Sequence, residues 1–173
     1  MSNYYNVSGE LIRQLVYPSG SSVFNIKTIS LTNIQKVSKC KVDLFIKKGS
    51  ESKIYLLKSM ELPIGATLIY DCVEFKNTIN QYGLFMKLTD GNTFTLTGSI
   101  DVTGTNTNVP GSGTAFLSEL SIGDEIVVSG ETRTISSITS DTAAVVSAAW
   151  GSDLANDTTP DCNPKALVDV IIS

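Results

Sequence analysis

Alternating apolar and polar residues run through the first half of the chain and predict strands rather than helices. The clearest stretch is 39–47, where every second residue is apolar. These apolar positions are Cys40, Val42, Leu44 and Ile46, and they alternate with Lys39, Lys41, Asp43, Phe45 and Lys47, which are expected on the solvent side. A period of two is typical of a strand with one buried face and one wet face. Turn-forming residues at 48–51 and a further strand-like stretch at 53–58 follow, so 39–58 is predicted to form a β-hairpin.

Other stretches before residue 98 show the same pattern. Strands are expected at 10–17, 23–33, 66–71, 82–89 and 93–97, and 73–80 is ambiguous. Pro18 to Gly20 ends the first strand, and Asp90-Gly91 indicates a hairpin turn between the last two. The apolar positions of 23–33 change from even to odd near Lys27–Thr28, which predicts a β-bulge. About seven or eight short strands with no helical period predict a β-sandwich.

The second half of the chain has shorter strands and more turns. Strands are expected at 99–102, 125–129, 132–139 and 142–150, with a helical turn at 114–120 capped by Thr114. This order describes a small β-barrel. Residues 151–163 are expected to be an aperiodic polar loop. The last strand, at 167–172, is expected to close the first sandwich and to bury side chains on both faces. These side chains are Leu167, Val168, Val170 and Ile171.

The predicted fold is therefore all-β, an antiparallel β-sandwich with an inserted small β-barrel domain. Residues 1–97 and 164–173 form the sandwich body, and 98–163 hold the inserted module and its polar return loop. Charge changes at the same place: residues 1–97 carry 11 basic and 7 acidic residues, whereas 98–173 carry 2 and 10. A shift of this kind indicates a domain boundary. Insertions are tolerated at exposed loop tips.

The side-chain inventory limits the possible chemistry. The chain has no histidine, which removes the commonest general base and metal ligand. Cys40, Cys72 and Cys162 are odd in number and widely spaced, which predicts small buried hydrophobes in a reducing cytoplasm rather than disulfides or a zinc site. Asp153 and the acidic residues near it lack the alternate spacing and distal glutamate of a calcium loop. We therefore predict no catalytic residue, no cofactor and no metal.

Two further motifs carry little chemistry. Gly111-Ser112-Gly113 has Phe116 where a dinucleotide-binding motif needs glycine, so it is expected to be a turn. The acidic residues between 119 and 131 are expected to be surface carboxylates rather than a glycosidase pair. The lysines between 36 and 53 are expected to line a wet sandwich face, because only two arginines accompany them and nucleic-acid readers rely on arginine.

The N-terminal residues are the one candidate interface. Residues 1–10 have neither a basic patch nor an apolar run, so we expect no signal peptide, and no stretch reaches the length of a membrane span. The adjacent Tyr4 and Tyr5 stand in an otherwise polar segment. Tyrosine is enriched at interfaces. We expect residues 1–9 to be either an arm that lies on an adjacent subunit or a frayed tail.

Two parts of the chain resemble structural proteins of tailed bacteriophages. Residues 95–150 are similar to a module of those proteins through GSGTAF at 111–116, ELSIGDEIVV at 119–128 and ETRTISSITSDT at 131–142. The body resembles the small β-sandwich proteins of phage virions. The shared phrases are KTISLTN at 27–33, VDLFI at 42–46, ELPIGATL at 61–68 and VDVIIS at 168–173.

The resemblance implies a virion component of the tail, neck, baseplate or capsid decoration, assembled in the host bacterial cytoplasm. Its partners would be other virion proteins, in a homo-oligomer or a ring on a partner ring, with no specific nucleic acid and no membrane. It implies structural roles at six positions: turns at Gly111 and Gly113, core anchors at Phe116 and Leu120, and carboxylates that bind backbone N–H groups at Asp124 and Asp141. The alternatives are an adhesive module that binds host-surface glycan or protein, and a wall-degrading enzyme.

Overall fold

The computed structural model describes residues 2–17, 25–76 and 82–173, with backbone only at 25 and 72–76. The expected turn at Pro18 to Gly20, the start of the strand at 23–33 and the end of the ambiguous stretch 73–80 lie outside the described residues. The chain divides into two compact units. One, the body, comprises 1–35, 39–90 and 166–173, and the other, the insertion, comprises 36–38 and 91–165.

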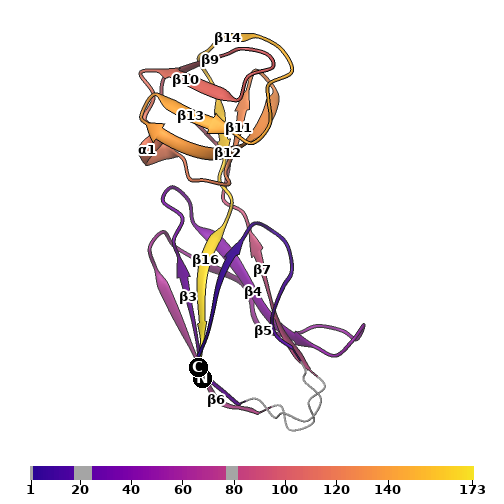
Figure 1. Cartoon of the computed structure of the whole chain (residues 1–173). Coiled ribbons are helices and arrows are strands. Elements are labelled where there is room, and N and C mark those ends of the chain that lie inside the picture. The colour runs from indigo at the N-terminus through magenta and orange to yellow at the C-terminus, as the bar shows by residue number, and fades with distance from the viewer. Residues whose placement is uncertain (1, 18–24, 77–81) are drawn as a thin grey trace. The chain divides into compact units, whose positions relative to one another are not determined.

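The first sheet of the body has four antiparallel strands in the order β1, β16, β3, β6. They are β1 (Asn3–Ser8), β16 (Leu167–Ile172), β3 (Asn25–Asn33) and β6 (Thr67–Lys76). The last strand of the chain, yellow in Figure 1, therefore lies between β1 and β3 and pairs with both. This confirms that 167–172 closes the body sheet.

The second sheet of the body is also antiparallel, in the order β2, β7, β4, β5. Its strands are β2 (Arg13–Val16), β7 (Gly83–Thr89), β4 (Cys40–Lys47) and β5 (Ile54–Leu62). Side chains from both sheets share one buried core, which includes Leu31, Val42, Met86 and Val170. The predicted all-β sandwich is thus confirmed, and so is the hairpin between 39 and 58, which corresponds to β4 and β5.

The predicted bulge in the first sheet is present. The register between β3 and β6 shifts between Ile26 and Thr28. The N–H groups of Lys27 and Thr28 both donate to the Ser173 carbonyl, at 2.7 and 3.0 Å. Two residues of one strand opposite a single residue of its partner define a β-bulge. The extra residue lets the apolar side chains before and after the bulge point into the same core.

Burial along β16 differs from the expectation. Val168, Val170 and Ile172 are buried, whereas Asp169 and Ile171 are exposed. The strand is central within its sheet, but only one face of that sheet packs on the core. An antiparallel sheet commonly leaves its other face to solvent. The prediction of burial on both faces was wrong because centrality in a sheet does not imply a layer on each side.

The N-terminal segment is not a free arm. Residues Asn3–Ser8 form β1 and pair with β16 of the same chain from Asn3↔Ile172 to Ser8↔Leu167. Val7 is buried in the body core and the Gly9 N–H donates to the Ala166 carbonyl. The expectation of an arm or a frayed tail was wrong, because pairing with a strand distant in sequence orders a segment whose own composition is polar.

Asp90-Gly91 is not a hairpin turn. The strand that follows, β8 (Phe94–Thr95), pairs with β15 (Asp161–Asn163), and β7 pairs with β2 and β4. The chain passes from the body to the insertion at these two residues. A turn dipeptide marks a change of direction and does not say which strands it joins.

The insertion is built on one eight-stranded sheet. Its order is β14, β9, β10, β13, β12, β11, β15, β8. Besides β8 and β15, its elements are β9 (Ser99–Val102), β10 (Asn108–Ser112), α1 (Phe116–Glu119), β11 (Glu125–Val128), β12 (Glu131–Ser140), β13 (Ala143–Val146) and β14 (Leu154–Asp157). Phe116 and Leu120 are fully buried in its core, as the resemblance implied.

Several expectations for the insertion need correction. The described strands do not close into a barrel, because β14 and β8 end the ladder without pairing with each other. The stretch 151–163 contains β14 and β15 rather than a structureless loop, and the strand expected at 142–150 is confined to Ala143–Val146. Thr114 does not cap α1 through its side chain; instead its hydroxyl donates to the Asp141 carbonyl at 2.6 Å.

Candidate interaction surfaces

The outer face of the β2-β7-β4-β5 sheet carries an aromatic cluster. Phe45 and Phe85 are directly opposite each other on β4 and β7, and their rings stack with centroids 5.7 Å apart. Tyr55 on β5 packs at 5.6 Å from the Phe45 ring. Phe45 is 0% exposed, yet it is not part of the core between the sheets. A second, small apolar layer therefore covers the outside of this sheet.

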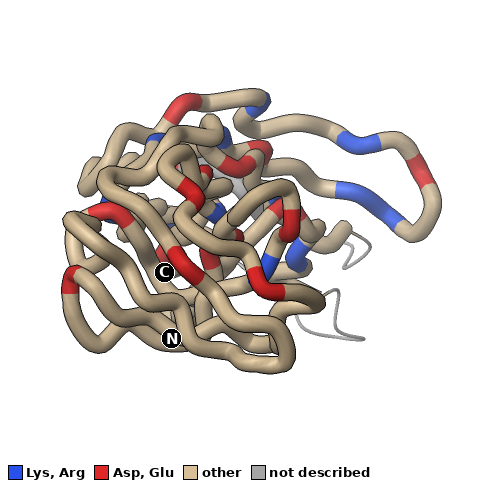
Figure 2. Tube along the Cα trace, turned by 90° about the horizontal axis from the view of Figure 1, so that it is seen from above, with Lys and Arg blue, Asp and Glu red and all other residues tan. Residues whose placement is uncertain are grey.

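Lysines cover that aromatic cluster. Lys53 places its Nζ 4.6 Å from the centroid of Phe45, Lys47 lies 5.0 Å from Phe85, and Lys58 lies 5.2 Å from Tyr55. Each contact is a cation–π interaction, in which the lysine stem also shields the ring from water. Figure 2 marks the charged positions along the chain.

Two further lysines extend the same surface. Lys41 lies on β4 on the side of Phe45, and Lys87 lies on β7 directly opposite Asp43. The Asp43 carboxylate accepts the Ser59 N–H at 2.7 Å. We call this surface the lysine face. It comprises Lys41, Asp43, Phe45, Lys47, Lys53, Tyr55, Lys58, Phe85 and Lys87. The sequence predicted a wet lysine-bearing face here but placed Phe45 in solvent, whereas Phe85, Tyr55 and Lys53 cover its ring.

The outer face of the β1-β16-β3-β6 sheet has a different character. The register aligns Tyr4 with Ile171, Ile171 with Ser30, and Ser30 with Ile69. These four residues form a row across all four strands, which we call the apolar row. Tyr4 is 72% exposed, Ile69 63% and Ile171 42%. These three side chains are large and apolar, and none of them belongs to the body core.

Polar residues flank the apolar row on both sides. On one side Asn6 donates to Asp169 at 2.8 Å, and the Thr32 and Thr67 hydroxyls are 2.9 Å apart. On the other side the hydroxyls of Thr28 and Ser173 are hydrogen bonded, and Asp71 lies opposite Thr28. A carboxylate therefore borders the apolar row on each side, at Asp169 and at Asp71.

The two candidate interface tyrosines lie on opposite faces of β1. Tyr4 points outward in the apolar row, whereas Tyr5 packs against the body core. The Tyr5 hydroxyl donates a hydrogen bond to the Leu15 carbonyl on β2. Tyr5 thus joins the two sheets of the sandwich, and only Tyr4 is available at the surface. The other exposed members, Ile69 and Ile171, were missed because their partners in the row are distant in sequence.

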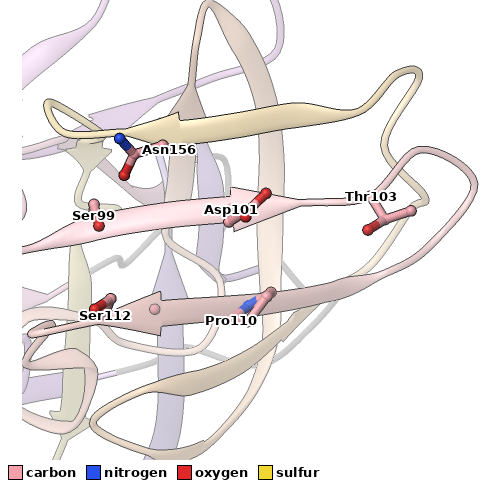
Figure 3. Close-up of a pocket in the computed structure, with 7 residues that line it drawn as sticks. Ser99, Asp101, Thr103, Pro110, Ser112 and Asn156 are labelled. Carbon is pink, nitrogen blue, oxygen red and sulfur yellow. The ribbon is translucent and has the colours of Figure 1, made fainter.

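A shallow depression of about 430 Å³ lies on the insertion (Figure 3). Ser99, Asp101 and Thr103 reach it from β9 and beyond, because they alternate with the buried Ile100 and Val102. The neighbouring strands complete the lining with Pro110, Gly111, Ser112 and Asn156. Asn156 has a φ of +50° at a register shift in β14. The lining offers hydroxyl, amide and carboxylate groups but no aromatic ring.

Trp150, the one tryptophan, is unavailable to a ligand at the surface of the insertion. It is 1% exposed and belongs to the insertion core. The Arg133 guanidinium lies 5.5 Å from its ring centroid and donates to the Ala149 carbonyl at 2.8 Å. Arg133 is itself paired with Glu131. Sugar-binding sites usually present exposed aromatic rings, and this ring is covered.

Carboxylates in the insertion bind backbone N–H groups in its turns. Six side chains do so: Glu119 binds Thr97, Asp124 binds Ser121 and Lys165, Glu131 binds Gly151, Asp141 binds Leu117, Asp153 binds Gly104, and Asp157 binds Ser129 and Thr159. This confirms the backbone-binding role that the resemblance implied for Asp124 and Asp141. We call these carboxylates the turn staples. Most of the negative charge of the insertion is used in building its loops.

The turn staple at Asp157 has a lowered pKa. Partial burial opposes ionisation, but the N–H groups of Thr159 and Ser129, with both hydroxyls, outweigh it and lower the pKa of Asp157. The staple holds the Ser129-Gly130 turn between β11 and β12. Ser129 has a φ of +48°, and Gly130 one of +85°, as a two-residue hairpin turn of this hand requires.

Two cysteines are buried, as expected. Burial, with the nearby charge of Asp90, raises the pKa of the Cys40 thiol to about 11. Burial and the charges of Asp124, Glu119 and Asp161 also raise the pKa of Cys162. Both thiols stay protonated near neutral pH and are poor nucleophiles. The side chain of Cys72 lies outside the described residues.

Among the described residues, no group of three or more His, Cys, Asp or Glu side chains is placed to hold a metal ion. No described helix has both the length and the apolar character required to cross a membrane. Comparisons with protein-family models, with curated proteins and with solved structures find no match to this chain.

Proposed function

We propose that this chain is a structural subunit of a tailed-phage virion that acts through protein–protein contacts in a repeated assembly. The observation that carries the proposal is the pair of unlike surfaces on the two outer faces of one sandwich, the lysine face and the apolar row. Enzymes concentrate polar side chains in a cleft, whereas here the conspicuous groups lie on broad sheet faces. The resemblance of the sequence to phage structural proteins suggests that the assembly is a virion.

The architecture suits such a role. The body is a small sandwich whose first and last strands pair with each other, and the insertion is held by turn staples rather than arranged around a reactive group. Repeated structural subunits need rigid folds with sheet faces and edges that other chains can contact. Such a subunit would belong to the tail, neck, baseplate or capsid decoration.

Mass spectrometry of purified particles tests this proposal. Virions collected from the bacterial culture that produces the native protein should contain the chain in a reproducible ratio to the major capsid protein. Antibodies raised against the insertion should decorate one location on those particles in electron micrographs. Particles that lack the chain after density-gradient purification would refute the proposal, whatever its behaviour in isolation.

The depression on the insertion favours one second candidate, an adhesive module that binds host-surface glycan or protein. Its hydroxyl and amide groups are suited to polyols, although Trp150 is buried and no ring lines the site. Binding of the purified protein to a host-glycan array, compared with the Asp101→Ala variant, tests this candidate. Signal that the substitution does not reduce would exclude the depression as the binding site.

A further inference from the structure

We propose that copies of this chain associate head to tail, with the apolar row of one body packed on the lysine face of the next. This inference rests on the proposed repeated assembly and names the surfaces that would make it. The two surfaces lie on the outer faces of opposite sheets of the same sandwich. Each copy would therefore use one face to bind the copy before it and the other to bind the copy after it.

The apolar row has the character of a surface that is covered in the assembled state. Its members come from four strands and still align in a single line, Tyr4 to Ile171 to Ser30 to Ile69. Neighbouring strands lie about 4.8 Å apart, so Tyr4 and Ile171 are adjacent, and the small Ser30 separates Ile171 from Ile69 within the same line. Apolar area with an aromatic anchor and a polar rim is the usual composition of an interface centre.

Charge decides which surface covers the row. Asp169 and Asp71 border it on its two sides, and both side chains are exposed. If two apolar rows packed on each other around a two-fold axis, four carboxylates would meet within one interface. Such like-charge contacts disfavour a pairing. The charges beside the row therefore argue against the symmetric dimer and require a basic partner surface.

The lysine face provides that partner surface. Five lysines lie on it against two carboxylates: Asp43, whose oxygen already accepts the Ser59 N–H, and Glu61, which lies opposite Lys41. Neighbouring Lys39 is paired with Glu61 at 2.9 Å and does not add to the excess. The ammonium groups of Lys47, Lys53 and Lys58 lie over aromatic rings. The methylene stems that carry them, together with the rings, offer apolar surface to Ile69, Ile171 and Tyr4. The ammonium groups of Lys41 and Lys87, which lie beside the rings, suit Asp71 and Asp169.

Contact between unlike surfaces has a geometric consequence. A heterologous interface repeats from copy to copy and closes into a ring, or continues as a filament, according to the rotation between neighbours. A contact of one patch with itself would stop at a dimer. The placement of the two surfaces thus favours a chain of many copies.

A mixing experiment tests the inference with two double variants of the full chain. The row variant carries Ile69→Glu and Ile171→Glu, and the face variant carries Lys41→Glu and Lys87→Glu. These lysines contact no aromatic ring among those described, and the row residues are exposed, so both variants should stay folded by circular dichroism. The face variant should have a slightly lower thermal midpoint, because its new glutamates face Glu61 and Asp43 across the strands. Analytical ultracentrifugation then measures mass as a function of protein concentration.

Wild-type protein is expected to form species larger than dimers. Raising the salt concentration about tenfold should shift these species toward monomer, because salt screens the contacts between lysines and carboxylates. Each variant alone should be monomeric at the same concentration. An equimolar mixture should form heterodimers and nothing larger, because only one intact row and one intact face remain to meet. The Asp101→Lys variant, changed on the insertion, is the matched control and should associate like wild type.

Other outcomes overturn the inference. Dimers of the face variant alone would indicate that the row pairs with itself. Oligomers of the row variant alone would indicate that the acidic insertion, not the row, occupies the lysine face. Wild-type protein that stays monomeric at millimolar concentration would refute self-association. If virions contain the chain and the row variant is incorporated equally well, this inference fails while the proposed function stands.

Discussion

The Asp90 carboxylate accepts a hydrogen bond from the Ala166 N–H at 2.8 Å, although 76 positions separate the two residues in sequence. Asp90 is the last body residue before the insertion and Ala166 is the first body residue after it. The bond therefore joins the two points where the body chain is interrupted. Glu10 adds to the same junction by accepting the Asp90 N–H at 3.3 Å.

The body should fold without the insertion, because this junction holds the two chain ends together. We expect replacement of residues 91–165 by a short Gly/Ser linker to leave a cooperatively unfolding β-protein, since short loops add little closure entropy. Circular dichroism during thermal unfolding measures this. The control lacks 166–173 as well and should be unfolded, because β16 is then missing. An unfolded linker variant would show that the body depends on the insertion.

Neighbouring residues of β16 should differ sharply in their effect on stability. Val170→Ala removes buried methyl groups from the body core and should lower the free energy of unfolding by about 2 kcal/mol. Ile171→Ala changes the adjacent residue on the exposed face and should cost less than about 1 kcal/mol. Urea denaturation of both variants measures the difference. Equal losses would contradict the one-sided burial of this strand.

The two N-terminal tyrosines offer a second matched pair. Tyr5→Phe removes the hydroxyl that binds the Leu15 carbonyl and should destabilise the body by about 1 kcal/mol. Tyr4→Phe removes an exposed hydroxyl with no such bond and should leave the free energy of unfolding unchanged. Chemical denaturation at neutral pH distinguishes them. If both variants match wild type, the bond between the two sheets contributes nothing measurable.

Stability should fall in acid through the Asp157 turn staple. Its pKa is lowered on folding from an ordinary value of 3.8, so the unfolded chain takes up the proton first as pH falls. The stabilising contribution is present above pH 3.8 and disappears as pH falls through the lowered folded value. Unfolding measured between pH 6 and pH 2 should show this loss, and Asp157→Asn should have a shallower dependence. If wild type and Asp157→Asn lose stability equally steeply with falling pH, Asp157 does not contribute to the acid sensitivity.

The two described thiols should resist alkylation in the native protein. Cys40, with a pKa of about 11, and Cys162, whose pKa is also raised, are buried and protonated near neutral pH. Peptide mapping by mass spectrometry after iodoacetamide treatment should find both unmodified in buffer and both modified in concentrated guanidinium chloride. Rapid native labelling of either thiol would show that its unit opens locally.

Local patterns were enough to predict much of the body. The alternation at 39–47 predicts β4, and the change from even to odd apolar positions predicts the bulge beside Thr28. The final strand was predicted from its apolar, β-branched run. In each of these cases the core imposes the pattern on adjacent residues, so the signal is present in a short window of sequence.

Features that depend on distant partners could not be predicted in this way. β1, β14 and β15 are rich in Asn, Asp and Tyr and lack a clear apolar period, and only pairing with remote strands makes them strands. The apolar row is visible only once the registers of four strands are known. Phe45 was placed in solvent because alternation gives the face of a residue but not what covers that face.

The turn staples give a different meaning to the acidity of the protein, whose isoelectric point is about 4.8. Where an aspartate or glutamate closes a loop, its presence reflects the turn that it stabilises and not the charge of any ligand. Homologous sequences could lose these six carboxylates only by rebuilding the loops with other residues that bind backbone N–H groups or adopt tight turns, such as asparagine, serine or glycine. The low isoelectric point then reflects how the loops are built. It does not indicate that the protein prefers cationic partners.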